Sequence, residues 1–105
     1  LNVVGLDVAD GAGSPAKHKV LAACPGSGAD LISEAAATGA TVFLTGEMKH
    51  HEQMQALRHG MSLILAGHTN TERGVFKPWA KVLQKAFPNI NIKRSRRDRH
   101  PLRRL

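Results

Sequence analysis

The chain has 105 residues, enough for one domain or part of one, and with one Trp, three Phe and no Tyr its core must be mainly aliphatic. The net charge is +7, but residues 93–105 hold seven Lys/Arg against one acid, so the whole chain is not evenly basic. One cysteine, Cys24, excludes an internal disulfide and indicates a reducing compartment. With no membrane-spanning run and no signal-peptide pattern, we expect a cytoplasmic protein and leave nucleus and mitochondrion open.

The first elements along the chain are two predicted strands and the linker between them. Residues 1–8 form an apolar run that begins without Met, so we expect a strand and a piece of a longer polypeptide. Residues 9–18 are rich in Gly, Ala, Ser and Pro, which predicts a loop. Residues 19–24 predict a short buried strand. Pro-Gly-Ser-Gly at 25–28 predicts a tight turn, with an anion cradle at a helix start as the alternative.

Helices and strands then alternate. Apolar spacing predicts helices at 29–38, 49–58 and 75–87, with strands at 41–45, 62–66 and 90–92. Met54 should point inward from the second helix, and the third helix carries an apolar stripe: Val75, Trp79, Val82, Leu83 and Ala86. This alternation predicts an α/β fold with a small, mostly parallel sheet and crossover helices.

Polar clusters follow two of the predicted strands. Residues 45–52 come after one apolar run and residues 67–74 after another. Because ligands of an open parallel sheet bind beyond the carboxyl ends of its strands, we expect both clusters to line one rim.

The first candidate pair is His68 and Glu72. If a helix starts near Thr69, these two side chains lie one turn apart and can face the same way. Imidazole nitrogen with carboxylate oxygen suits Zn, Fe, Mn, Co or Ni, so we predict divalent metal ligands. The alternative is a capping box, in which Thr69 is the N-cap and Glu72 reaches back to its N–H. Two ligands do not complete a site.

The second candidate group is Glu47, His50 and His51. Glu47 has i,i+3 and i,i+4 spacing to the two histidines. We predict Glu47 and His51 as catalytic proton carriers and His50 as a residue that supports the ligands or binds substrate. The alternative is a solvated first helical turn whose acids favour the helix dipole.

Four ordered segments give the chain a family resemblance. They are residues 20–28, 45–51, 64–74 and the Ser-x-x-Asp-Arg-x-Pro-Leu stretch at 95–102. Together they resemble the C-terminal half of the NGG-one-interacting-factor-three-like family, also named GTP cyclohydrolase 1 type 2 homologue. The resemblance implies that 1–18 is the end of an inserted domain plus linker, 19–94 an α/β metal-site half-domain, and 95–105 a basic C-terminal tail.

The resemblance also implies cofactors and partners. Relatives form toroidal homohexamers with paired divalent metal ions, so two ions per complete site are expected. The His-x-x-x-Glu motif carries metal ligands there, which corresponds to His68 and Glu72. The remaining ligands, a His pair and an acid, belong to an N-terminal half that lies outside this sequence, and His50 and His51 are not that pair.

Three functions follow as hypotheses. The first is a di-metal, hydrolase-like enzyme acting on a nucleotide-like or other small substrate. The second is an oligomeric, transcription-linked interaction scaffold with a structural metal. The third is nucleic-acid binding through residues 93–104. No aromatic residues interleave with the tail arginines, so stacking on unpaired bases is not expected.

Overall fold

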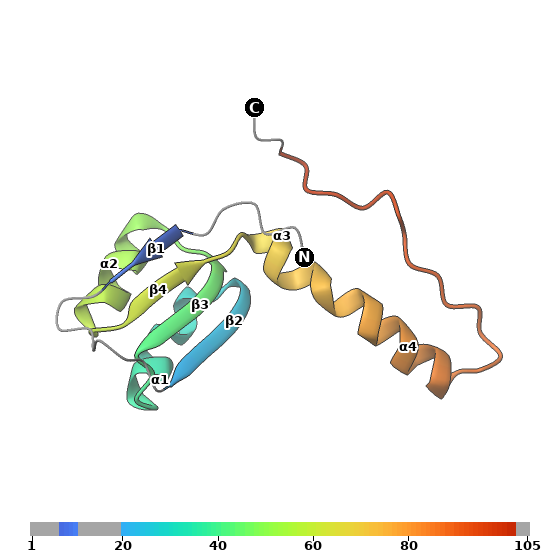
Figure 1. Cartoon of the computed structure of the whole chain (residues 1–105), viewed down its shortest axis with the longest axis horizontal. Coiled ribbons are helices and arrows are strands. Elements are labelled where there is room, and N and C mark those ends of the chain that lie inside the picture. The colour runs from blue at the N-terminus through green and yellow to red at the C-terminus, as the bar shows by residue number, and fades with distance from the viewer. Residues whose placement is uncertain (1–6, 11–19, 103–105) are drawn as a thin grey trace. The chain divides into compact units, whose positions relative to one another are not determined.

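Figure 1 shows the computed structural model of the chain, which describes residues 7–10 and 20–102. It has one sheet in the order β1-β4-β3-β2. The strands are β1 (Asp7–Ala9), β2 (Leu21–Ser27), β3 (Val42–Glu47) and β4 (Ser62–Leu65). β2, β3 and β4 are parallel, and β1 lies antiparallel to β4 at the edge. The predicted α/β fold with a mostly parallel sheet is confirmed.

The helices follow the predicted alternation. α1 (Ile32–Ala37) is preceded by a 3-10 turn at Ala29–Leu31, and α2 (His50–Arg58) connects β3 to β4. α3 (His68–Glu72) is a single short turn directly after β4. A second 3-10 turn, Arg73–Val75, leads into α4 (Phe76–Ala86), the longest helix in the described residues.

One face of the sheet carries the core. Phe43 and Leu63 lie side by side on β3 and β4 and are 1% exposed. α1 contributes Ile32 and α2 contributes Ala56 to the same cluster. The two helices also contact each other, so they cover this face together. The aliphatic core that the composition requires is therefore built around a single phenylalanine.

The other face of the sheet carries an apolar row. The strand registers align Val8, Ile64, Leu44 and Ala23 across all four strands. Side chains two apart in a strand share a face, so the core residues Phe43 and Leu63 point the opposite way. Val8 is 63% exposed and Ala23 is exposed. Among the described residues up to Glu72, no helix covers this row, unlike the core face.

Three local predictions were wrong. Residues 25–27 are not a tight turn, because β2 continues through them with a bulge between Cys24 and Ser27. Met54 is exposed, and the buried position of α2 is Ala56. Residues 90–92 form no strand, because the Gln84 side-chain amide bonds their backbone, donating to Ile90 O at 2.9 Å and accepting from Ile92 N at 3.3 Å.

The chain divides into two compact units between Glu72 and Arg73. We call them the N-terminal unit and the C-terminal unit. By sequence, residues 1–72 hold four Lys/Arg and seven acids, a balance of −3, whereas residues 73–105 hold eleven Lys/Arg and one acid, a balance of +10. The basic region thus includes α4 as well as the tail. The predicted division at residues 18 and 94 stays a prediction.

Among the described residues, none of the helices combines the length and the apolar character that crossing a membrane requires.

Candidate metal centre

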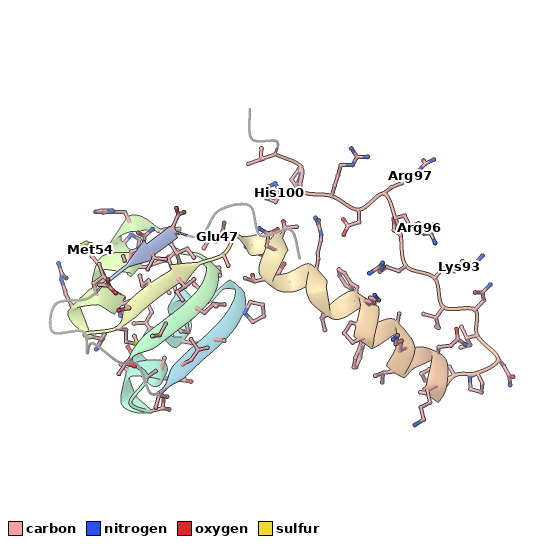
Figure 2. All side chains as sticks on the ribbon, in the orientation of Figure 1. Glu47, Met54, Lys93, Arg96, Arg97 and His100 are labelled. Atoms are coloured by element: carbon pink, nitrogen blue, oxygen red, sulfur yellow. The ribbon has the colours of Figure 1, made fainter. Side chains whose placement is uncertain are left out.

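The polar clusters after β3 and β4 meet at one edge of the N-terminal unit. His68 Nδ1 lies 2.9 Å from Glu47 Oε1, and His68 Nε2 lies 3.1 Å from Glu72 Oε1. Figure 2 shows Glu47 near the point where β4 passes into α3. The structure therefore brings together three of the five predicted site residues, at the carboxyl end of the sheet. Their metal-binding and catalytic roles stay predictions.

α3 begins at His68 for a local reason. Gly67 has φ +90°, a left-handed conformation that glycine adopts without a steric cost. The next turn is fixed by Asn70, whose Nδ2 donates to Ala66 O at 3.0 Å. The helix thus starts immediately after the strand, and His68 is held over the strand ends.

Two glycines allow the backbone of β2 and β3 to approach this turn. A Cβ added to Gly26 would lie 2.5 Å from Glu72 Oε1 and 3.3 Å from His68 Nε2. A Cβ added to Gly46 would lie 2.7 Å from His68 Cα. The distances of 2.5 Å and 2.7 Å are far below ordinary van der Waals contact, and 3.3 Å is tight. The two side chains thus fill a cradle that exists because these positions lack a Cβ.

Two threonines fasten the same junction, and the sequence analysis missed both. Thr71 Oγ1 accepts from Gly26 N at 2.9 Å, which joins α3 to β2. Thr45 Oγ1, fully buried, accepts from Gly28 N at 3.0 Å and donates to Gly26 O at 3.2 Å. These bonds satisfy the glycine N–H groups, so the anion-cradle alternative has no support at Gly26 or Gly28.

The electrostatics of the site centre on His68, whose side chain is 39% exposed. The hydrogen bond to Glu47 raises the pKa of His68 above its ordinary value. Partial burial opposes this shift, and the charges of Glu72 and Glu47 reinforce it. Without a metal, the two carboxylates favour an imidazolium that donates from both ring nitrogens.

His50 and His51 lie elsewhere, in the exposed first turn of α2. Neither side chain makes a hydrogen bond or ion pair to any other described residue. This turn is closed by Glu52, whose Oε2 accepts from Lys49 N at 2.6 Å. The arrangement resembles the solvated-turn alternative for the two histidines, and no contact with His68 supports His51 as a proton carrier.

The capping-box alternative for Glu72 does not hold. α3 starts at His68, whereas a Thr69 N-cap would place the first helical residue at Asn70, two residues later. In the described part of the chain, Glu72 makes no hydrogen bond to the Thr69 N–H and instead faces His68 Nε2. The acid therefore faces the imidazole, as the metal hypothesis requires.

A sequence model of the family described as Duf34/NIF3 (NGG1p interacting factor 3) matches residues 2–101. The chain belongs to the Duf34/NIF3 family. It is 44% identical over 85 residues to NIF3-like protein 1 from Bos taurus, covering 80% of this chain and 22% of that protein. It is 45% identical over 62 residues to the GTP cyclohydrolase 1 type 2 homolog of Deinococcus radiodurans, covering 59% of this chain and 23% of that protein.

Solved structures agree with this fold. Staphylococcus aureus protein SA1388 matches with a TM-score of 0.81 at 28% identity, over 99% of this chain and 34% of that one. A Bacillus cereus protein related to NIF3 matches with a TM-score of 0.70 at 24% identity, which supports the fold alone. The predicted family resemblance is confirmed, and the chain spans about a fifth to a third of these relatives.

The residues present fit part of a metal centre. His68 Nε2 and Glu72 Oε1 offer a nitrogen and an oxygen donor side by side in the cradle against Gly26. Glu47 contacts the other ring nitrogen, so the three side chains do not converge on one point. In agreement, no group of three or more His, Cys, Asp or Glu within the described residues is arranged to hold an ion. The described residues therefore place two donor atoms side by side, fewer than the three or more protein ligands that are usual for a metal site.

Proposed function

We propose that the chain contributes His68 and Glu72 as ligands to the divalent metal centre of a hydrolase-like Duf34/NIF3 protein. The observation that carries the proposal is the 3.1 Å approach of His68 Nε2 and Glu72 Oε1 beside Gly26. The name of the Deinococcus radiodurans relative, GTP cyclohydrolase 1 type 2 homolog, supports a nucleotide-like substrate class.

Glu47 has a defined task in this proposal. Its carboxylate accepts from Nδ1–H, which selects the tautomer whose Nε2 lone pair is free for a cation. We therefore propose Glu47 as a positioning residue for His68 and not as a proton carrier. In the metal-free chain the imidazolium also carries a proton on Nε2. This proton must leave when the bond to the metal forms, so metal uptake releases a proton.

The centre is completed from outside the described residues. Two protein ligands are fewer than the three or more that are usual, and the chain spans 22% of the Bos taurus relative. We propose that the remaining donors belong to the rest of a longer polypeptide and that a complete site holds two ions. A bound metal would act as a Lewis acid and lower the pKa of water.

Metal titration tests the ligand assignment. We expect the 105-residue chain to bind Co²⁺ or Zn²⁺ weakly by calorimetry and His68→Ala and Glu72→Gln to abolish that binding. Glu47→Gln should weaken it by about 10- to 100-fold, because the carboxylate orients the ring. His51→Ala is the matched control and should bind as the parent does. Equal binding by His68→Ala and the parent would contradict the proposal.

Turnover separates an enzyme from a scaffold. The longer polypeptide that carries this chain, loaded with metal, should hydrolyse a nucleotide or ester substrate, and His68→Ala should not. A fully loaded protein without turnover on any such substrate would favour the structural-metal scaffold instead.

Assembly is the second candidate function, and the apolar row on the uncovered sheet face favours it. We propose that this face is buried in a homo-oligomer of the longer protein, with a hexamer as the state that the resemblance implies. Leu21, which is exposed on the same face, is a suitable probe. Leu21→Glu should lower the mass measured by light scattering, whereas Leu31→Glu, at an exposed position outside the sheet, should not. An unchanged mass for both variants would contradict this proposal.

A further inference from the structure

A groove runs along α4 in the C-terminal unit. One wall is formed by Phe76, Trp79 and Leu83, and the other by Ile92 and Arg94 of the non-helical segment that follows. The groove has a volume of about 320 Å³. Trp79 is 54% exposed and Phe76 is 47% exposed, so both rings offer open aromatic surface.

A second hollow continues this groove. It has a volume of about 470 Å³, shares Phe76 and Arg94 with the first, and adds Arg73 and Arg96. Aromatic and guanidinium groups thus line one continuous surface. No aromatic residue interleaves with the tail arginines in sequence, but the chain reverses after α4 and brings Trp79 and Arg94, fifteen residues apart, into one groove.

The charge of this surface is almost entirely positive. The C-terminal unit has a balance of +10, and its one acid, Asp98, is taken by Arg73 Nε at 2.7 Å. Arg94 and Arg96 have no ion-pair partner among the described residues. Figure 2 shows Lys93, Arg96 and Arg97 following one another along the segment after α4. Such a field attracts an extended polyanion.

We propose that this groove binds single-stranded nucleic acid, with a base stacked on Trp79 and adjacent phosphates held by Arg94 and Arg96. The proposal goes beyond the metal function. Aromatic platforms combined with a basic groove are the usual means of holding single strands without sequence preference. An acidic peptide is the weaker match. Lys and Arg side chains occur both on α4 and on the segment that follows it, and this repeated positive charge suits the repeating negative charge of a phosphate backbone.

Trp79 is the only tryptophan, so its fluorescence reports the groove directly. The 105-residue chain is titrated with a dT 12-mer, a U 12-mer and an abasic DNA strand of the same length. Stacking predicts quenched Trp79 emission with both base-bearing strands and little quenching with the abasic strand. Equal quenching by the abasic strand would overturn the stacking site, because phosphate alone would then account for it.

Variants separate the stacking and charge contributions in anisotropy measurements with a labelled strand. Trp79→Leu should weaken binding roughly 5- to 100-fold with an unchanged salt slope. The double variant Arg94→Gln/Arg96→Gln should reduce the salt slope by about 1.4, for two lost phosphate contacts. The controls are Val82→Ala, an exposed apolar position of α4 outside the groove, and Arg58→Gln in the N-terminal unit.

Other occupants give distinct results. Tighter binding and stronger quenching by an acidic peptide with Phe anchors than by the dT strand would assign the groove to a protein partner. If the chain self-associates, if its Trp79 emission is then already blue-shifted, and if no strand alters that emission, the groove would be assigned to a second copy of the chain. Both outcomes would overturn the nucleic-acid proposal, whereas base-dependent quenching lost in Trp79→Leu supports it.

Discussion

The two units use their aromatic residues in opposite ways. In the N-terminal unit Phe43 is buried at the centre of the core, whereas in the C-terminal unit Trp79 lies on an exposed helix face. The charges differ equally, at −3 and +10. A residue buried within its own unit contributes chiefly to folding, and an exposed ring beside unpaired arginines contributes little to it. The aromatic residue of the N-terminal unit therefore stabilises a core, whereas that of the C-terminal unit leaves an aromatic surface exposed.

The largest expected difference in unfolding free energy is between the variants of Phe43 and Trp79. Phe43→Ala should lower the free energy of unfolding by about 3–5 kcal/mol, because it leaves a cavity under two helices. Trp79→Ala should change it by less than about 0.5 kcal/mol, as at other exposed positions. Urea unfolding followed by circular dichroism measures both. A loss for Trp79→Ala comparable to that for Phe43→Ala would remove the distinction between the units.

The second test compares Gly46 with Gly74. A Cβ at Gly46 would lie 2.5 Å from Gly26 O, and backbone cannot move aside easily, so Gly46→Ala should cost about 1–3 kcal/mol of unfolding free energy. A Cβ at Gly74 meets nothing within 4 Å, so Gly74→Ala should be neutral or stabilise by about 0.4–1 kcal/mol. Thermal unfolding of the two variants gives the comparison. If Gly46→Ala is neutral, the cradle is looser than described.

The third test compares a buried with an exposed hydrogen-bonding side chain. Thr45→Val leaves the buried Gly28 N–H without its acceptor and should destabilise the chain by about 1–3 kcal/mol. Gln84→Ala also removes bonds to backbone groups, but water replaces them at this exposed position, and less than about 0.5 kcal/mol should be lost. The midpoints of urea unfolding measure the two losses of stability. Equal losses in the two variants would show that exposure of a hydrogen bond does not determine the cost of removing it.

The smallest expected effect concerns pH. The two carboxylates that face His68, from Glu47 and Glu72, raise its folded-state pKa above 6.5 in the metal-free chain. Its contribution to stability is therefore fully present below the unfolded value and lost as pH rises through the folded pKa. NMR titration of the imidazole should show this pKa falling toward 6.5 in Glu47→Gln, with Glu52→Gln as the control. An unchanged pKa in Glu47→Gln would exclude the Glu47 contact in solution.

The sequence predicts the sheet and the meeting of the site residues because both follow from short-range patterns. Apolar runs mark the strands, and the carboxyl-end rule places Glu47 and His68 at one rim. The i,i+4 spacing then puts Glu72 beside His68. His51 shares that spacing with Glu47 but lies one element further on, in a turn that faces solvent.

What the sequence does not reveal are contacts that depend on partners far along the chain. Thr45 and Thr71 look like ordinary polar positions, and only the fold shows that Thr71 accepts from a glycine N–H in β2 and Thr45 from the glycine N–H that directly follows β2. Glycines at 26 and 46, each near a strand end, were the available signal for a close approach. Trp79 and Arg94 likewise meet only because the chain reverses after Pro88.

The threonine contacts limit how the centre can be transferred to another protein. Thr71 sits between His68 and Glu72 on α3, and its hydroxyl is held by Gly26, more than forty residues earlier. A synthetic peptide containing only residues 67–74 would retain both donor groups and lose the anchor that aligns them. Transplantation into a new scaffold would require three non-adjacent segments together, from β2, β3 and α3.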